Sequence, residues 1–434
     1  MKITIIGHGY VGLVSASVFA DLGNEVWVIG RDQAKIDKLK KGEILFFEPG
    51  LKEVVQRNLK AKRLKFTLSY KEAISNSQIA FICVGTPPGE GGAADLSNVF
   101  SVARQIGKNI KDYILIVCKS TVPVGTNKKI QKLLVEELKI NSKRFDIASC
   151  PEFLKEGTAL SDTLNPDRIV IGVEAKKAEE YLLTLHKPIN GARVLTNIES
   201  AEMIKYVSNA FLATKISFAN ALSFLCEKTG ADIEKVMDGV GIDKRIGRNF
   251  LYPGVGYGGS CFPKDVKALI KTAENYGENL QILKEVEKIN VEAIERFVAK
   301  VKIMLNGSFS GKTLGILGLS FKPNTDDIRE APSLKIIDEI QKIDKKVKIK
   351  VFDPVAMKNV SKIAKNVIYC QNSYDTAKEA DLLIIVTEWN EFRQLNLERI
   401  KKLMRRPVIL DGRNIYDPKT MLKIGFDYKS IGRN

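Results

Sequence analysis

Strand-like segments, glycine turns and helical segments alternate at both ends of this 434-residue chain. That alternation predicts an α/β protein with two Rossmann-like, doubly wound domains joined by a helical central region with one long helix. Lys2–Ile6 is followed by a GxGxxG turn, and Thr313–Leu317 is followed by Gly318 and a helical run. We expect the domains to span residues 1–198, 199–300 and 301–434.

The amino-terminal segment has the pattern of a dinucleotide-binding βαβ unit. Lys2–Ile6 is short, β-rich and ended by glycine, as buried strands are. The turn Gly7-His8-Gly9-Tyr10-Val11-Gly12 follows, then a helical run to about residue 22, then a second strand at Glu25–Ile29. The first two glycines allow a tight turn and a close pyrophosphate, and the third lets helix and strand pack. This order predicts a dinucleotide site at the amino terminus.

Three further strands are expected, at residues 79–84, 114–120 and 146–150. Thr86, Thr121 and Glu152 follow their carboxyl ends. Ligands of a parallel α/β sheet bind outside the carboxyl ends of its strands, so these side chains are candidate site residues. The alternative is ordinary turn chemistry, which also favours Thr and Pro.

Residues 199–228 form one amphipathic run that predicts a helix of unusual length, suited to connecting domains or to a dimer seam. Lys205 and Asn209 are four residues apart on it and share a face. That face points either to solvent or into a cleft with Cys261.

Cys261 lies in the most informative segment of the chain, Gly254-Val255-Gly256-Tyr257-Gly258-Gly259-Ser260-Cys261-Phe262-Pro263-Lys264-Asp265. The small residues allow a close approach of backbone to ligand. Pro263 suits the first turn of a helix, so the thiol is expected at a helix amino terminus, near Lys264. Such surroundings favour the thiolate nucleophile, and Asp265 would lie one turn on. The alternative is a buried cysteine beside a tight turn.

A second α/β unit begins near residue 312. It comprises a strand at Thr313–Leu317, a helix at 333–343 and a strand at Lys348–Phe352, followed by strands at 382–387 and 408–410. Its order resembles that of the amino-terminal unit. Two nucleotide-binding units suggest two nucleotide-type ligands, one a dinucleotide and the other a nucleotide-linked substrate.

Composition narrows the function classes. No uncharged apolar stretch approaches the roughly 20 residues of a membrane span, and the amino terminus lacks the apolar length of a signal peptide. Six scattered cysteines without metal-type spacing indicate a reduced, cytoplasmic setting and no metal site. The two histidines leave acid–base work to Lys, Asp, Glu, Thr or water. The net charge of +17 is spread over helix-like segments, which favours solvated faces over nucleic-acid binding.

Eight segments in order resemble the UDP-glucose/GDP-mannose dehydrogenase family, over essentially the whole chain. They are Gly7 to Gly12, Glu48-Pro49-Gly50-Leu51, Val84-Gly85-Thr86-Pro87-Pro88, Ser120-Thr121-Val122-Pro123, Pro151-Glu152-Phe153-Leu154, Gly258 to Asp265, Phe321 to Glu330, and Asp411-Gly412-Arg413. The sequence around Cys261 is similar to that of the family branch that acts on UDP-glucose. The resemblance implies oxidation of C6 of UDP-glucose by four electrons to UDP-glucuronate, through a thiohemiacetal and a thioester on Cys261.

The same resemblance implies the site residues. The catalytic residues would be Cys261, Lys205, Asp265, Asn209, Thr121 and Glu152. The dinucleotide would contact Gly7, Gly9, Tyr10, Val11, Gly12, Gly30, Arg31, Lys35, Thr86, Thr121, Glu156, Lys264 and Arg329. The UDP-sugar would contact Phe153, Leu154, Lys155, Glu156, Lys205, Asn209, Phe250, Leu251, Tyr252, Pro253, Gly254, Gly258, Lys322 and Arg413, with Arg245 from a second subunit. Alternative roles are surface ion pairs for Arg245, Arg413 and Lys322, a helix cap for Glu156, and a backbone hydrogen bond for Asn209.

One departure concerns the cofactor. The family usually ends its second strand with an acidic residue that binds the adenosine ribose, and here Gly30 is followed by Arg31 and Asp32. NAD remains the expected cofactor, but loss of the carboxylate and the presence of Arg31 make NADP an equal candidate. Asp32 is the alternative ribose ligand.

Other readings remain open. The chain is expected to form at least a homodimer through its long helix, by the same resemblance. The competing functions are oxidation of another nucleotide sugar, such as a UDP-N-acetylhexosamine or GDP-mannose, and a catalytically silent nucleotide-binding regulator or nucleic-acid binder. The intact Cys261, Lys205 and Asp265 argue against a silent protein.

Overall fold

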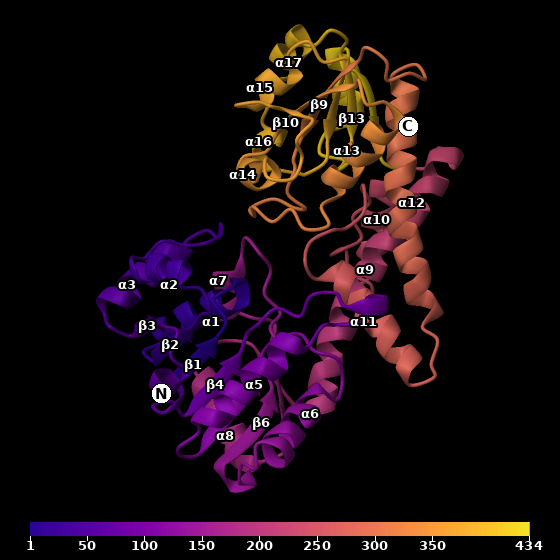
Figure 1. Cartoon of the computed structure of the whole chain (residues 1–434). Coiled ribbons are helices and arrows are strands. Elements are labelled where there is room, and N and C mark those ends of the chain that lie inside the picture. Colours follow the sequence, from indigo (N-terminus) through magenta and orange to yellow (C-terminus); the bar gives the residue numbers. More distant parts are fainter. Residues whose placement is uncertain (434) are drawn as a thin grey trace. The chain divides into compact units, whose positions relative to one another are not determined.

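The computed structural model describes residues 1–433, which form two compact units (Figure 1). Unit 1 comprises residues 1–208 and 267–278, and unit 2 comprises residues 209–266 and those from 279 onward. Unit 1 holds an eight-stranded sheet and unit 2 a six-stranded sheet. The predicted fold class, with two doubly wound α/β sheets and a helical central region, is confirmed. The domain limits at residues 198 and 300 stay a prediction.

The sheet of unit 1 has the strand order β3-β2-β1-β4-β5-β6-β7-β8. Its strands are β1 (Lys2–Ile6), β2 (Glu25–Ile29), β3 (Leu64–Thr67), β4 (Ile79–Ile82), β5 (Ile114–Cys118), β6 (Phe145–Ser149), β7 (Arg168–Val173) and β8 (Ala192–Thr196). Neighbouring strands are parallel except β6 and β7, which are antiparallel. The expectation of a parallel sheet is therefore wrong at this one pair.

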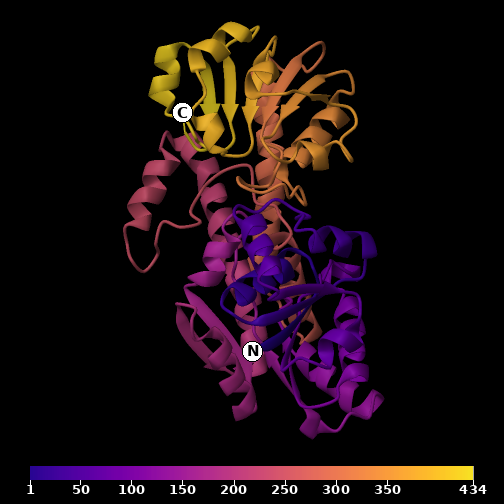
Figure 2. The same cartoon turned by 90° about the vertical axis from the view of Figure 1, so that its left-hand side faces the viewer.

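Helices cover both faces of this sheet (Figure 2). Ile3 and Ile5 of β1 belong to the core on one face and Ile6 to the core on the other, as the alternation of a strand requires. The first core includes α1 (Tyr10–Asp21), α2 (Gln33–Lys40), α3 (Leu51–Lys60), α7 (Ala159–Leu164) and α8 (Lys176–His186). The second includes α4 (Tyr70–Ile74), α5 (Ser97–Asn109) and α6 (Thr126–Lys132), which leads into a π turn at Leu133–Glu137.

The sheet of unit 2 has the order β11-β10-β9-β12-β13-β14, and all its neighbours are parallel. Its strands are β9 (Thr313–Leu317), β10 (Lys348–Phe352), β11 (Ile368–Tyr369), β12 (Leu382–Ile385), β13 (Val408–Asp411) and β14 (Asp427–Ser430). One face packs on α12 (Gln281–Met304), α13 (Pro332–Ile343) and α14 (Met357–Val360). The other packs on α15 (Ser373–Ala377), α16 (Asn390–Arg393), α17 (Leu397–Leu403) and α18 (Pro418–Ile424).

The predicted long helix is α9 (Ile198–Thr229), with 32 residues, which begins in unit 1 and ends in unit 2. The shorter helices α10 (Ile233–Gly241) and α11 (Phe262–Asn275) follow it. A second long helix, α12, with 24 residues, was not predicted as a separate element. Among the helices of residues 1–433, none is long and apolar enough to span a membrane.

Candidate active site

The glycine turn after β1 has the geometry that a bound pyrophosphate requires. Gly7 has a φ of +115°, and a Cβ there would lie 2.4 Å from the carbonyl oxygen of Cys83. A Cβ on Gly12 would lie 2.0 Å from the carbonyl oxygen of Gly7. Only glycine therefore fits at these two positions. Because α1 begins at Tyr10, its first N–H groups and the positive end of its dipole follow the turn directly.

The turn after β2 is crowded at Gly30, so a side chain there would require Ile36 and His8 to shift. A Cβ there would lie 2.6 Å from Cδ1 of Ile36 and 2.9 Å from Nδ1 of His8. The His8 ring, from the glycine turn, thus lies beside the position that a side chain at residue 30 would occupy. Burial, followed by the positive charge of Lys35, lowers the pKa of His8 below its usual value.

The residues that follow Gly30 have separate roles. Asp32 is the N-cap of α2, because its side chain accepts a hydrogen bond of 3.1 Å from the backbone N–H of Lys35. Arg31 is exposed, with Nη1 3.5 Å from the Oδ1 of Asn98. The carboxylate of Asp32 is therefore already engaged, while Arg31 presents a positive charge at the surface.

Two loops that the sequence placed at the carboxyl ends of β4 and β5 lie side by side. The hydroxyl of Thr86 donates a hydrogen bond of 2.9 Å to the carbonyl oxygen of Thr121. Ser120 links the same loops, since its hydroxyl donates to the carbonyl oxygen of Val84 at 2.6 Å. Thr86 and Thr121 therefore belong to one cluster at this edge of the sheet.

Glu202 anchors the loop that contains Thr121. Its side chain is buried and accepts hydrogen bonds from the backbone N–H groups of Gly125 at 2.6 Å and Asn127 at 2.9 Å. Burial raises the pKa of this carboxyl group, an effect that the hydrogen bonds from Asn127 and Gly125 oppose. Glu202 lies less than one turn before Lys205 on α9, so one helix holds both the loop and the lysine.

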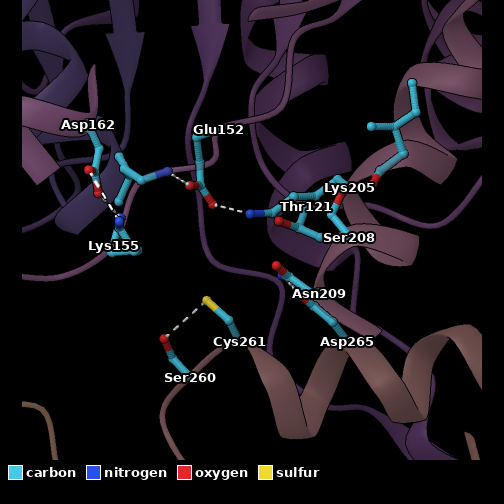
Figure 3. Close-up of polar contacts among 12 residues, drawn as sticks. Thr121, Glu152, Lys155, Asp162, Lys205, Ser208, Asn209, Ser260, Cys261 and Asp265 are labelled. Atoms are coloured by element: carbon cyan, nitrogen blue, oxygen red, sulfur yellow. Dashed lines mark hydrogen bonds and ion pairs between the residues drawn. The ribbon is translucent and has the colours of Figure 1, made fainter. Parts of the chain in front are cut away.

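Glu152 and Lys205 form a buried ion pair (Figure 3). Nζ of Lys205 lies 3.0 Å from Oε1 of Glu152, and the two side chains are 5% and 8% exposed. The other oxygen, Oε2, accepts a hydrogen bond of 2.9 Å from the backbone N–H of Leu154. The Phe153 ring lies near two cations, with its centroid 5.2 Å from Nζ of Lys205 and 4.0 Å from the guanidinium of Arg168.

The segment 153–156, predicted to line the sugar site, is also held at its far end, and so is Gly157 after it. Lys155 donates its backbone N–H to Asp162 at 2.9 Å and forms an ion pair of 3.6 Å with the same carboxylate (Figure 3). Gly157, with a φ of +85°, donates its N–H to Glu48 at 2.6 Å. The loop is therefore ordered by carboxylates outside it.

The glycines before Cys261 pack closely against other residues of the chain, while the predicted close approach to a ligand stays a prediction. A Cβ on Gly258 would lie 2.2 Å from the carbonyl oxygen of Glu330, and Gly259 has a φ of +83° with the Phe321 ring beside it. Gly259 also donates its N–H to the carbonyl oxygen of Arg329 at 2.9 Å. The glycine segment therefore packs against the 321–330 motif within unit 2.

Cys261 immediately precedes α11, as the sequence predicted. The helix begins at Phe262, Pro263 is its second residue, and Asp265 donates its N–H to the carbonyl oxygen of Cys261 at 2.9 Å. The side chain of Cys261 is exposed, with its sulfur 3.7 Å from the hydroxyl of Ser260. The thiol therefore belongs to the residue just before the amino terminus of α11, where the helix dipole is positive.

Asp265 is fully buried at the start of α11. It accepts a hydrogen bond of 2.6 Å from the side-chain amide of Asn209 (Figure 3). It also forms an ion pair with Lys264. Lys264, expected from the sequence beside the thiol, thus directs its charge to this carboxylate. The alternative role for Asn209, a backbone hydrogen bond, is replaced by this side-chain contact.

Unit 2 brings several predicted substrate residues to the end of β13. A Cβ on Gly254 would lie 2.8 Å from Nη1 of Arg413, two residues beyond that strand. Arg413 donates Nε to the carbonyl oxygen of Val386 at 2.7 Å and lies 3.3 Å from Glu388. Phe250 has a φ of +67°, which turns the chain into the 251–258 segment. Other members of this set are buried Leu251, Pro253 and Gly258 and exposed Tyr252.

Three cations of the predicted site have local partners. Arg245, whose side chain is 88% exposed, pairs with Asp243 at 2.6 Å. Arg329 pairs with Asp327 at 2.6 Å, and Nζ of Lys322 lies 5.7 Å from the Phe321 ring. Glu156 and Lys35 lie at the surface of unit 1, half-buried and exposed respectively.

Sequence reasoning missed two residues that shape the unit 1 site, Glu48 and Arg168. Glu48 was visible as part of the Glu48-Pro49-Gly50-Leu51 segment but received no role. Arg168 gave no signal, because its place beside Phe153 depends on the reversed direction of β7. Within residues 1–433, no group of three His, Cys, Asp or Glu side chains is placed to hold a metal ion.

The chain matches three models of the UDP-glucose/GDP-mannose dehydrogenase family. The NAD binding domain matches residues 1–190, the central domain residues 199–292, and the UDP binding domain residues 315–418.

Comparison with relatives that match over the full length agrees with the family models. The chain is 44% identical to a UDP-glucose 6-dehydrogenase of Pseudomonas aeruginosa, covering 100% of this chain and 98% of that one. It is 45% identical to a UDP-glucose 6-dehydrogenase of Bacillus subtilis, covering 100% and 93%. Its structure resembles that of a UDP-glucose dehydrogenase from Pyrobaculum islandicum, with a TM-score of 0.90, 37% identity and coverage of 99% and 96%.

Proposed function

The chain belongs to the UDP-glucose/GDP-mannose dehydrogenase family, and we propose that it oxidises the C6 alcohol of UDP-glucose to the carboxylate of UDP-glucuronate. The observation that supports this most strongly is the identity of 43–45% with UDP-glucose 6-dehydrogenases over the whole chain. The chain is thus a nicotinamide-dependent oxidoreductase. The cytoplasmic location stays a prediction.

The reaction transfers four electrons in two hydride steps. The alcohol first loses a proton and a hydride, which gives an aldehyde and one reduced dinucleotide. The Cys261 thiolate adds to the aldehyde, and the resulting thiohemiacetal transfers a second hydride to a second dinucleotide, leaving a thioester. Water then hydrolyses the thioester to the carboxylate and restores the thiol. The position of Cys261 directly before α11 supports this role.

The remaining catalytic groups stabilise charge and move protons. Lys205 and Asn209 would stabilise the oxyanions that form at C6. Asp265 and Thr121 would hold the water that acts as base or nucleophile, and Glu152 is the other acid–base candidate. Support for these roles comes from the buried Lys205–Glu152 pair and the buried Asn209–Asp265 bond.

Ligand-binding roles are proposed for the other residues. In unit 1, the glycine turn and Thr86 would bind the dinucleotide, and 153–156 would line the sugar. In unit 2, Phe250 to Gly254, Gly258, Lys322 and Arg413 would bind the UDP-sugar, while Lys264 and Arg329 would contact the dinucleotide. Glu156 would contact both ligands, and Arg245 would reach the site of a second subunit, in keeping with its exposure.

We further propose that NADP is accepted in addition to NAD. Gly30 offers no carboxylate to bind the ribose, and Asp32, two residues on, caps α2. Arg31 and Lys35 are both exposed in this part of the chain, and the positive charges of both act on the His8 ring. A 2′-phosphate would therefore meet positive charge and a charge-assisted hydrogen-bond donor, without repulsion from an acidic side chain.

A homodimer through α9 is proposed as the minimal assembly. Phe211, Phe218 and Leu225 are 62%, 52% and 56% exposed and are spaced by seven residues, so they form one apolar face of the helix. A second copy of the same face would cover it symmetrically. In analytical ultracentrifugation, the wild-type protein is expected to sediment as a dimer and the Phe218→Asp variant as a monomer. A wild-type protein that sediments as a monomer would contradict the proposal.

The experiment that tests the function is a steady-state assay of the purified protein. UDP-glucose is supplied with NAD or NADP, and reduced dinucleotide is counted against sugar consumed. The expected ratio is two. A ratio of one would contradict the second oxidation. Faster turnover of a UDP-N-acetylhexosamine or of GDP-mannose would show that this sugar nucleotide, and not UDP-glucose, is the substrate.

A further inference from the structure

The side chain of Glu48 connects the dinucleotide turn to the segment that precedes α7. It is 7% exposed and lies in the loop before α3. Its Oε2 accepts hydrogen bonds from the hydroxyl of Tyr10 and from the backbone N–H of Gly157, the latter at 2.6 Å. Its Oε1 accepts a hydrogen bond of 2.7 Å from the N–H of Ala159. All four residues belong to unit 1.

Tyr10 completes this cluster from the cofactor side. It is the first residue of α1 and the fourth residue of the glycine turn. Its hydroxyl also accepts a hydrogen bond of 2.9 Å from the N–H of Gly157, so that N–H is shared between Tyr10 and Glu48. The ring packs on Phe46, with centroids 4.7 Å apart. Burial, followed by the hydrogen bond to Glu48, raises the pKa of Tyr10, which keeps the hydroxyl protonated as a donor.

Gly157 is the residue through which the cluster reaches the sugar segment. Its φ of +85° is in the left-handed region, and it directly follows Phe153 to Glu156. The next residue but one, Ala159, begins α7. The orientation of the sugar segment therefore depends on where Glu48 holds its end.

From this geometry we propose that Glu48 is a positioning residue that couples dinucleotide binding to UDP-sugar binding in unit 1. The inference rests on the proposed function. A dinucleotide bound at the turn fixes the first residue of α1, and with it the Tyr10 hydroxyl. Tyr10 then holds the carboxylate of Glu48, which in turn holds Gly157. Occupancy of the turn and order in the sugar segment therefore favour each other.

Coupling of this kind is reciprocal. If the dinucleotide tightens the binding of the sugar nucleotide by some factor, the sugar nucleotide tightens dinucleotide binding by the same factor. A residue needed only for folding would weaken both affinities without changing that factor. The coupling factor therefore separates a positioning role from a structural one.

The test uses reduced dinucleotide, because UDP-glucose then cannot be oxidised. The dissociation constant of UDP-glucose is measured by titration calorimetry with and without saturating NADH or NADPH. The wild-type protein is expected to bind UDP-glucose about fivefold or more tightly in the presence of the dinucleotide. In Tyr10→Phe, which removes only the hydroxyl, the ratio is expected to fall to about one. Glu48→Gln, which replaces an accepting oxygen by an amide, is expected to do the same.

Tyr113→Phe is the matched control. The Tyr113 hydroxyl donates a hydrogen bond of 2.7 Å to Asp146, elsewhere in unit 1. Its loss is expected to leave the wild-type ratio in place. A wild-type ratio of one, or an unchanged ratio in both Tyr10→Phe and Glu48→Gln, would overturn the coupling while leaving the proposed function intact. Failure of the wild-type protein to bind UDP-glucose at all would overturn the proposed function together with the coupling.

Discussion

Lys205 and Glu152 are joined by a contact of 3.0 Å in which both side chains are more than nine-tenths buried. Removing one partner of such a pair leaves the other charge without compensation, which typically costs about 3–5 kcal/mol. A substitution at either residue is therefore expected to affect both the chemistry proposed for unit 1 and the stability of that unit.

Lys205→Ala is expected to lower kcat by about 100-fold or more, and to change KM much less, because the contact strengthens as charge develops at C6. Steady-state kinetics, corrected for the folded fraction, provide the measurement. Lys128→Ala is the control on an exposed ion pair, since Lys128 contacts Glu199 of α9 with its side chain 58% exposed. A change confined to KM in Lys205→Ala would contradict the oxyanion role.

Cys261→Ser is expected to slow the overall reaction drastically, and Cys261→Ala to retain most of its affinity for UDP-glucose. The physical reason is that a hydroxyl is not ionised near neutral pH, whereas the thiol at the start of α11 is favoured as a thiolate. Turnover and calorimetric binding are the two measurements. Cys370→Ala removes another thiol of unit 2, one not assigned to the site, and should behave like the wild type. Wild-type turnover in both Cys261 variants would refute the nucleophile.

Arg31→Ala is expected to lower kcat/KM for NADP by about tenfold or more, the loss typical of a charge-assisted hydrogen bond, while kcat/KM for NAD changes little. Initial rates with each dinucleotide test this. Arg104→Ala, which breaks an exposed pair with Glu137, controls for the loss of one positive charge. A strong wild-type preference for NAD that Arg31→Ala leaves unchanged would rule out NADP.

Acidification is expected to lower the free energy of unfolding of unit 1 around His186. Burial, followed by the charge of Lys119, lowers the pKa of His186 to about 4. The unfolded chain, with a histidine pKa of about 6.5, then binds more protons than the folded one, so stability falls as pH drops from about 6.5 toward 4. At pH 5 the loss relative to pH 7 is about 2 kcal/mol.

Amide hydrogen exchange of α8 at pH 5 and pH 7 measures this loss, and His186→Gln should reduce it. His186 lies at the end of α8, with Nδ1 2.8 Å from the carbonyl oxygen of Leu182, so the amides of this helix report on the ring directly. Equal losses in the variant and in the wild type would show that other groups cause the pH dependence.

Much of the fold was visible in the sequence because apolar strands and glycine turns are local signals. β1, β2, β9 and β10 lie where they were predicted, and α9 differs by one residue at each end. The reversed direction of β7 was not predictable, because a six-residue strand looks the same in either direction. The short strand β11 and the boundaries of α12 had no distinct pattern.

Some features of the candidate site were predictable from the sequence, and others were not. The glycine turn and the position of Cys261 before a helix follow from residue types and were confirmed locally. The crowding at Gly30 comes from the side chains of Ile36 and His8, whose packing no local pattern reveals. The role of Glu48 depends on Gly157, 109 residues away in the chain.

The reversal of β7 has a practical consequence for anyone engineering this chain. Because β7 runs against β6, its first residue, Arg168, lies beside Phe153, whereas its carboxyl end lies toward the opposite edge of the sheet. The turn between β7 and α8, at residues 174–175, therefore follows the end of β7 that lies away from Phe153. A fluorescent reporter or an affinity peptide grafted into that turn is therefore expected to leave the contact between Arg168 and Phe153 in place.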